Sequence, residues 1–419
     1  MSPRAVLVIG VGVAGTAAAV AASKAGASVT VVAAVPGASS LMSGAADLLP
    51  WELPHAMTAP LPDTCPWRGL LDDLDLWRVG DTPARLASLA GILRPARGRD
   101  RALLDLAPLR SARIAVPRVA RPSFNADLLV RGWNADPLAE ESGLRFEAVD
   151  VPGLLLDAEL HAPDTIVARA FDDSRRVQLA AASLAGTLDG FVAVLLGPWL
   201  GIETDAASTL GRALDRAVGE PLSALAGSAG ARFESASARL IAAHGLTRVE
   251  DTVAALRRGP RWRAELEHGS AVEADAVVVA TGGMISGGIE FAPSGARESD
   301  EFPEPPTRAF RTAFACDELC LRIGGAAVEA PGSLHGPNLE DLRWPGVAEE
   351  RAVFERVGIR CDASLCAVDG TGAPITGCMF EDSRCWVQVT PLVRYCRISA
   401  TAVTRPAMKP PPGWLCPRR

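Results

Sequence analysis

A glycine-rich segment near the start of the chain carries the residues whose spacing points most directly to chemistry. Gly10, Gly12 and Gly15 form a G-x-G-x-x-G pattern, with Val13 and Ala14 between the last two glycines. The first glycine of such a pattern allows a tight turn, the second lets the backbone approach a pyrophosphate, and the third lets a helix pack close to a strand. The segment therefore predicts a dinucleotide-binding turn, and all five residues are expected to contact the cofactor.

A second group of small residues lies far along the chain. The apolar segment 274–280 runs into Thr281 and Gly282, and more small residues follow at 286–288. Small residues at the C-terminal end of a buried strand let the chain pass close to a cofactor. We therefore predict that Ala280, Thr281 and Gly282 form a second wall of the same site. Taken alone, this segment fits a plain buried strand with a glycine turn better.

The elements that must position the first glycines are a strand over 5–9, a helix over 14–25 and a second strand over 28–32. NAD sites usually hold a ribose hydroxyl with an acidic residue at the end of the second strand. Here the chain continues as Ala33-Ala34-Val35 instead. This disfavours NAD and leaves a flavin held mainly through its phosphates. A signal peptide and a plain packing turn are the weaker alternatives.

Candidates for the reaction itself are few. Ser43 and Gly44, in the loop after the second strand, are expected to contact the cofactor, and Ser43 and Asp47 would approach the flavin ring if this loop covers it. A loop-capping role for Ser43 and Asp47 is the open alternative. His244 and His268 are interpreted as structural or solvated. His335, in a late loop, is the one histidine retained as a candidate catalytic base.

Composition limits the class of protein. The chain has 419 residues, 48% of them hydrophobic and 22% charged, and a net charge of −7. The negative charge argues against a nucleic-acid surface, and no apolar run reaches the length of a membrane span. The nine cysteines lack the C-x2-C spacing usual for zinc or iron–sulfur sites. We expect reduced thiols, no metal, a cytoplasmic location and membrane association only through a partner.

The fold predicted from these patterns is α/β: a Rossmann-like FAD/NAD(P)-binding flavoprotein domain with an inserted second α/β domain. The first domain is expected over 1–50 and 245–377, and an inserted cap, substrate or subunit-contact domain over 51–244. Within the insert, Thr82–Leu93 predicts an amphipathic helix, Arg94–Arg101 a solvated loop and Asp205–Val218 a helix.

Three patches resemble one family, the B subunit of anaerobic glycerol-3-phosphate dehydrogenase. They are the Gly10 pattern, the loop SSLMSGAADLL at 39–49 and the segment VVVATGGMISGGI at 277–289. Residues 355–377 also resemble the stretch before the last flavin motif of that family. The resemblance implies a flavin-binding subunit that works with a larger flavoprotein A subunit and an iron–sulfur C subunit. That family oxidises sn-glycerol 3-phosphate to dihydroxyacetone phosphate and passes electrons to quinone.

The chain departs from this family at its end. After Gly377 the family continues with an apolar strand, a Gly-Asp turn and a helix facing the flavin. Residues 378–419 are instead rich in Cys, Arg and Pro. We interpret this tail as divergent, disordered or the product of a frame shift, which would remove one wall of the site.

Two other classes of function stay open at this point. One is another FAD-dependent oxidoreductase, fumarate-reductase-like or amine-oxidising, and the other is a non-catalytic electron-transfer or assembly subunit. FAD is the expected cofactor because the glycine pattern suits its pyrophosphate, while the missing ribose carboxylate leaves FMN open.

Overall fold

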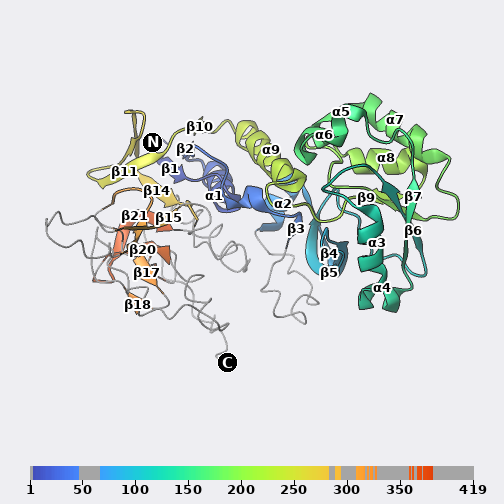
Figure 1. Cartoon of the computed structure of the whole chain (residues 1–419). Helices are drawn as coiled ribbons and strands as arrows, with labels where there is room; N and C mark the ends of the chain where they lie inside the picture. Colours follow the sequence, from blue (N-terminus) through green and yellow to red (C-terminus); the bar gives the residue numbers. More distant parts are fainter. Residues whose placement is uncertain are drawn as a thin grey trace, which may run out of the picture. The chain divides into compact units, whose positions relative to one another are not determined.

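The structure, a computed structural model, describes residues 3–46, 67–282, 288–293, 308–316, 319, 321–323, 326–327, 358–359, 361–362, 366–369 and 371–380. These residues form two compact units, each with its own parallel sheet (Figure 1). The first unit contains residues up to 35 and the described residues from 243 onward, and the second contains 36–242. Residues 36–46, which we expected in the flavin-binding domain, thus belong to the second unit.

The sheet of the first unit has six strands in the order β10-β2-β1-β14-β21-β20. The four pairings from β10 to β21 are parallel, and β20 is antiparallel to β21. The helix α1 (Val13–Lys24) links β1 to β2 and packs on β1, β2 and β14. The strand bounds are β1 (Ala5–Ile9), β2 (Ser28–Val32), β10 (Thr247–Val249), β14 (Ala276–Val279), β20 (Cys366–Val368) and β21 (Pro374–Phe380).

Local sequence explains why this part folds as a Rossmann-like unit. Four of the five residues of β1 are buried and apolar, as expected for a strand covered on both faces of a parallel sheet. α1 buries Gly15, Thr16 and a run of alanines, whose small side chains let the helix lie close to the sheet. The predicted α/β, Rossmann-like fold class is therefore confirmed.

The strand β21 corrects the predicted start of the atypical tail. It continues through Cys378, Met379 and Phe380, which pair in parallel register with Val277–Val279 of β14. Cys378 and Met379 are buried. The first three residues of the segment assigned to the tail therefore complete the sheet, because their apolar side chains suit a buried strand. Residues 381–419 lie outside the described part.

Smaller antiparallel sheets complete the first unit. The meander β11-β12-β13 lies between β10 and β14 in the chain. The bounds are β11 (Val253–Arg258), β12 (Trp262–Leu266), β13 (Ala271–Ala274), β15 (Ile289–Pro293), β16 (Arg308–Thr312), β17 (Leu321–Ile323), β18 (Ala326–Ala327) and β19 (Gly358–Ile359). Trp262 of β12 joins the core of this unit with Leu7, Ile9 and Val277.

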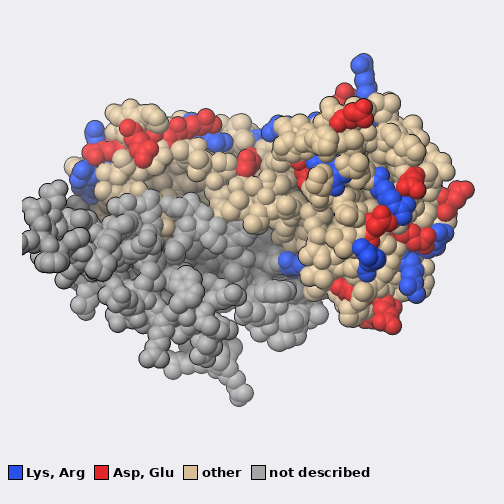
Figure 2. Space-filling view, in the orientation of Figure 1, with Lys and Arg blue, Asp and Glu red and all other residues tan. Residues whose placement is uncertain are grey.

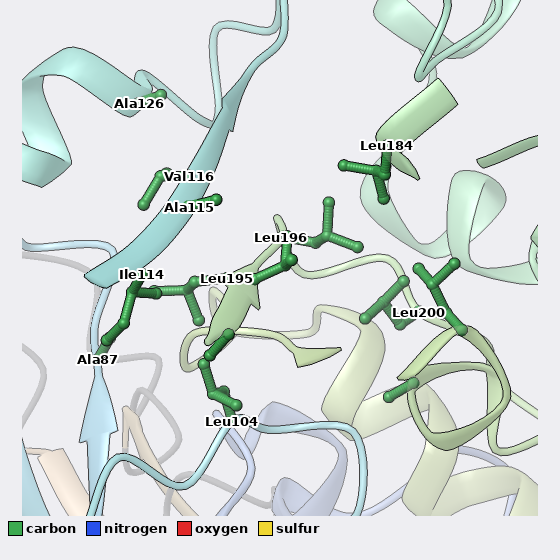
Figure 3. Packing of buried hydrophobic residues seen from close by; sticks show 14 of the residues in the cluster. Ala87, Leu104, Ile114, Ala115, Val116, Ala126, Leu184, Leu195, Leu196 and Leu200 are labelled. Atoms are coloured by element: carbon green, nitrogen blue, oxygen red, sulfur yellow. The ribbon is translucent and has the colours of Figure 1, made fainter. Parts of the chain in front are cut away.

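The second unit has an all-parallel sheet in the order β7-β6-β8-β9. Its strands are β6 (Arg113–Arg118), β7 (Arg145–Asp150), β8 (Ala193–Leu195) and β9 (Ala217–Gly219). Figure 3 shows part of its core, with Ile114 of β6 near Leu195 of β8 and with Val116 further along β6. Its helices are η1 (Ala38–Leu41), α2 (Trp67–Leu74), α3 (Ala126–Asn134), α4 (Pro137–Ser142), α5 (Asp157–Leu160), α6 (Asp164–Ala170), α7 (Ser174–Ala185), α8 (Ala206–Leu214) and α9 (Ser228–Ala243).

Two predictions in this unit were wrong at residues 82–101. The structure forms a hairpin there, β4 (Trp77–Ala87) and β5 (Leu93–Asp100), with β3 (Ala45–Ala46) on the other edge of β5. The leucine spacing in Thr82–Leu93 mimics a helix, but pairing with β5 decides the conformation. The predicted solvated loop is β5 itself, in which Arg97 and Asp100 are buried.

The predicted helix over 205–218 was too long. α8 ends at Leu214, because Asp215 adopts a left-handed conformation with φ of 50°. The chain then forms β9, which pairs with β8. Strand pairing again overrides a local helical pattern.

A buried cluster of charges ties together three parts of the second unit. Arg232 of α9 donates to Asp100 at 2.7 Å and to Glu220 at 2.6 Å, and all three side chains are fully buried. Burial raises the pKa of Glu220 to about 7, although the charge and hydrogen bonds of Arg232 oppose this rise. Burial alone would lower the pKa of Arg232, but the two carboxylates raise it above its usual value.

Candidate functional site

The turn between β1 and α1 is shaped by glycines that admit no side chain. Gly10 has φ of 110°, and a Cβ added there would lie 2.3 Å from the carbonyl oxygen of Ala280. A Cβ on Gly15 would lie 2.0 Å from the carbonyl oxygen of Gly10. Both distances are far below van der Waals contact. The two glycines are therefore required for the close approach of the turn to β14 and of α1 to the turn.

The N-terminus of α1 has no side-chain cap. Its N-cap is Gly12, and its first turn has no acidic residue. The first N–H groups of a helix have no acceptor within the helix and carry a partial positive charge. In the second unit, side chains cap α3, α4, α7 and α8; they belong to Asn125, Asp136, Asp173 and Asp205.

The end of β14 forms the other side of this turn. The N–H of Ala280 donates to the carbonyl oxygen of Ile9 at 2.8 Å. Thr281 and Gly282 follow, and Gly288 packs so closely that a Cβ on it would lie 2.3 Å from the carbonyl oxygen of Gly282. The structure thus brings the Gly10 turn and the residues Ala280–Gly282 together, although the two segments lie far apart in the sequence.

Topology places this junction where dinucleotides bind in such sheets. The chain passes from β1 to β2 on one side and returns through β14 on the other, so the strand order reverses between β1 and β14. Ligands of open parallel sheets bind at the carboxyl ends of the strands at such a switch point. We call the group Gly10–Gly15 with Ala280–Gly282 the switch-point cradle.

The structure shows no carboxylate at the end of β2, in residues 33–35. After Val32 the N–H of Ala33 donates to the carbonyl oxygen of Val249 at 3.1 Å, so β2 stays joined to β10 at this point. Ala34 and Val35 are exposed. Apolar side chains stand where a ribose-binding acid is expected.

Ser43 and Gly44 lie in the second unit. The carbonyl oxygen of Ser43 accepts from the N–H of Ser223 at 2.9 Å. Gly44 has φ of 103°, and a Cβ on it would lie 2.9 Å from Leu103. Packing against β5 and its continuation therefore accounts for Gly44, and contact of these two residues with a cofactor stays a prediction.

Asp47 and the catalytic candidate His335 lie outside the described residues. His268 is in the turn after β12, and its Nδ1 lies 2.7 Å from Asp251. That hydrogen bond raises the pKa of His268, but the side chain is 81% exposed. An exposed ion-paired histidine on a hairpin turn fits the solvated role expected for it.

Within the described ranges, no group of three or more His, Cys, Asp or Glu side chains could hold a metal ion. Nor does any helix in the same ranges combine the length and apolarity needed to cross a membrane. On the face seen in Figure 2, basic and acidic side chains are interspersed over the described residues.

The second unit has a switch point of its own, between β6 and β8, which its own side chains fill. After β6 the chain supplies Arg121, and after β8 it supplies Trp199, with the guanidinium 5.3 Å from the ring centre. Arg121 also donates to Asp164 at 2.5 Å. We call Arg121, Trp199 and Asp164 the switch-point plug. Sequence reasoning missed it, since no local pattern links these three residues.

The chain was compared with known proteins. Neither a protein-family model nor a curated protein matches it. Among solved structures, it is similar to iminodiacetate oxidase (IdaA) from Chelativorans sp. BNC1, with 14% identity and a TM-score of 0.30 over 97% of each chain. It is also similar to CtdE in complex with FAD (11% identity, TM-score 0.22, 67% of this chain and 39% of that chain).

A third similar structure is L-amino acid deaminase from Proteus vulgaris (15% identity, TM-score 0.24, 67% of this chain and 47% of that chain). The chain spans less than half the length of CtdE, of this deaminase and of several other matched structures. The Rossmann-like assignment therefore rests on the strand order and the switch-point cradle of this chain.

Proposed function

We propose that this chain is an FAD-binding oxidoreductase subunit, and that it acts as the B subunit of a glycerol-3-phosphate dehydrogenase of the anaerobic type. In this proposal it acts in the oxidation of sn-glycerol 3-phosphate to dihydroxyacetone phosphate. In the same proposal, the chain works with a flavoprotein A subunit and an iron–sulfur C subunit, and electrons pass to quinone. These partner subunits would also supply any contact with the membrane. The glycerol-3-phosphate assignment is supported by the three sequence patches that resemble that family.

The observation that carries the flavin proposal is the switch-point cradle. Backbone from Gly10–Gly15 and from Ala280–Gly282 meets at the carboxyl ends of β1 and β14, and the helix between them lacks a side-chain cap. A pyrophosphate accepts hydrogen bonds from such N–H groups and is stabilised by the helix dipole. The residues present therefore fit the pyrophosphate of FAD, which FMN lacks.

The roles of this chain's residues follow from that fit. Gly10 and Gly15 keep the turn and α1 close to β14, so that the first turn of α1, with Val13, Ala14 and Gly15, would hold the pyrophosphate. Thr281 and Gly282, which follow β14, would border the bound cofactor. When bound, FAD supplies the hydride acceptor that oxidation of an alcohol carbon requires. His335 is the proposed base.

The test is reconstitution of the full chain with FAD and, in parallel, with FMN. After gel filtration, we expect FAD to remain bound and to give a flavin absorption spectrum, and FMN to be lost. If the chain retains neither flavin, the flavin proposal fails and the non-catalytic assembly role is favoured.

The substrate is tested separately on the FAD-loaded chain combined with its A and C subunits. Under anaerobic conditions, glycerol 3-phosphate should bleach the flavin absorbance, and glycerol should not. Iminodiacetate and L-amino acids form the comparison arms. Bleaching by these amines without bleaching by glycerol 3-phosphate would contradict the specific assignment and favour an amine-oxidising flavoenzyme.

A further inference from the structure

The β4–β5 hairpin of the second unit contains a cavity that no step above uses. Trp77–Val79 pair with Asp100–Gly98, and pairing resumes at Ala84 opposite Ala96. Four residues, 80–83, thus stand opposite the single residue Arg97. This bulge opens a cavity of about 480 Å³ that is lined by Trp77, Arg78, Thr82, Arg97, Arg99 and Asp105, among others. Its volume lies in the range of small-molecule sites.

Strand geometry directs three guanidinium groups to one face of this hairpin. Arg97 and Arg99 are two residues apart on β5, so their side chains leave the same face. Arg78 stands directly opposite Arg99 in the antiparallel register, and cross-strand partners also share a face. All three arginines line the cavity. Like charges directly opposite each other destabilise a strand pair, unless an anion lies between them.

The three arginines differ in how deeply they are buried. Arg97 is only 3% exposed, and the Arg99 side chain is 24% exposed. Burial lowers the pKa of Arg99, and Arg78 lowers it further, while Asp105 partly offsets both effects. Asp105 lies 3.9 Å from Arg99, and its other oxygen accepts from the N–H groups of Arg85 and Ala107. Its charge is thus shared with backbone donors.

Two other acids of the cavity lining are exposed to solvent. Asp72 is exposed, and the Asp75 side chain is 71% exposed and pairs with Arg78 at 3.0 Å. Exposed ion pairs of this kind are weak and yield easily to a competing anion. An oxyanion entering the cavity would meet Arg97 and Arg99 behind Arg78, with the hydroxyl of Thr82 beside them.

We propose that this cavity binds a small ligand through a carboxylate or phosphate group, held by Arg78, Arg97 and Arg99. A guanidinium matches either group with two parallel hydrogen bonds, which makes arginine the preferred residue for planar and phosphate recognition. The inference concerns the second unit alone and does not depend on flavin binding by the first.

The test is isothermal titration calorimetry of the full chain with inorganic phosphate and, separately, with malonate, each at an ionic strength of about 0.15 M. We expect saturable binding of at least one probe with one site per chain. Binding of phosphate alone assigns a phosphate ester, binding of malonate alone assigns a carboxylate, and binding of both assigns a general oxyanion site. If neither probe binds saturably, the proposal is overturned.

Variants locate the binding. Arg78→Gln and Arg97→Gln should each weaken it at least about tenfold, as expected for loss of a charge-assisted hydrogen bond. Arg113→Gln is the matched control, because Arg113 is similarly exposed to Arg78 and pairs with Glu147 on the β6–β7 sheet. If Arg97→Gln fails to fold, the half-exposed Arg78 decides. Wild-type binding by Arg78→Gln would contradict the proposal.

Discussion

The two parallel sheets of this protein share a topological device and use it in opposite ways. In the first unit the strand order reverses between β1 and β14, and in the second between β6 and β8. The first reversal is surrounded by glycines and other small residues, and the helix N-terminus beside it has no side-chain cap. The second is filled by the switch-point plug, and α3, which follows β6, is capped by Asn125. A switch point in a parallel sheet is thus a place where a ligand can bind, and the side chains around it determine whether that space stays open.

Buried charge separates the two units as well. Among the described residues, Asp251 is the buried charged residue of the first unit. The second unit buries several ionisable groups: Arg97, Asp100, Arg121, Glu159, Arg176, Glu220 and Arg232. Three of these arginines, Arg121, Arg176 and Arg232, pair with acids. Because buried ions are stable only when paired, we expect this unit to be the more sensitive one to charge removal and to pH.

The largest effect is expected from breaking the switch-point plug. Arg121→Met leaves the carboxylate of Asp164, whose side chain is 15% exposed, without its guanidinium partner. The expected loss in the free energy of unfolding is about 3–5 kcal/mol. Urea denaturation followed by tryptophan fluorescence measures it.

Arg118→Met is the control for that change. Arg118 ends β6, which Arg121 follows, but its side chain is 40% exposed and pairs with Asp127 and Asp150. Its loss should cost about 1 kcal/mol or less. Equal losses in the two variants would show that the plug does not stabilise the second switch point.

The next effect is a dependence on pH that belongs to Glu220. Its pKa is about 7 in the folded chain and 4.5 for the free group, so the folded state retains a proton that the unfolded chain releases. Its contribution to stability is full below pH 4.5 and is lost as the pH rises towards 7. Relative to Glu220→Gln, the wild type should be more stable at about pH 5 than at about pH 8, by at most about 3 kcal/mol.

Glu147→Gln provides the control for the pH series. The hydrogen bond from Arg113 lowers the pKa of Glu147, and the pair is exposed, so the corresponding change should be small and opposite in sign. Thermal unfolding of the three proteins at these two pH values makes the comparison. An identical pH dependence in wild type and Glu220→Gln would contradict the assignment.

The smallest effect concerns the helix cap beside the second switch point. The side chain of Asn125 accepts from the N–H of Leu128 at 3.1 Å. Asn125→Ala should lower the free energy of unfolding by about 1 kcal/mol, and Asn125→Ser, which keeps a capping oxygen, should restore most of it. No loss in Asn125→Ala, measured by urea denaturation, would remove the cap from the contrast between the units.

Sequence reasoning reached the first switch point because its signals are local. The strand ending at Ile9, the glycines and the helix that follows are adjacent in the chain. The spacing of the glycines itself indicates a tight turn and close packing of the helix. Ala280–Gly282 was found through its small residues, although only the structure shows Ala280 against Gly10. Thr82–Leu93 was predicted wrongly, because pairing with β5 outweighs the helical spacing of its leucines.

The second switch point could not be found from sequence for the same reason. Arg121, Asp164 and Trp199 meet only after β6 and β8 have paired and α6 has docked. Arg97 and Arg99 likewise looked like parts of a solvated loop, until the β4–β5 register placed them on one face. Both groups of side chains are defined by contacts between segments that are distant in the sequence, so neither local pattern nor composition predicts them.

The central claim, that the N-terminus of α1 holds a pyrophosphate, is tested most directly by Ala14→Asp. Aspartate in the first turn favours the helix through its dipole, so α1 should remain folded while the charge repels a pyrophosphate. Ala14→Asn is the neutral control of similar size. In a titration with FAD followed by flavin fluorescence, the account predicts at least about 100-fold weaker binding for Ala14→Asp than for Ala14→Asn. Equal affinities in the two variants, with both folded, would contradict it.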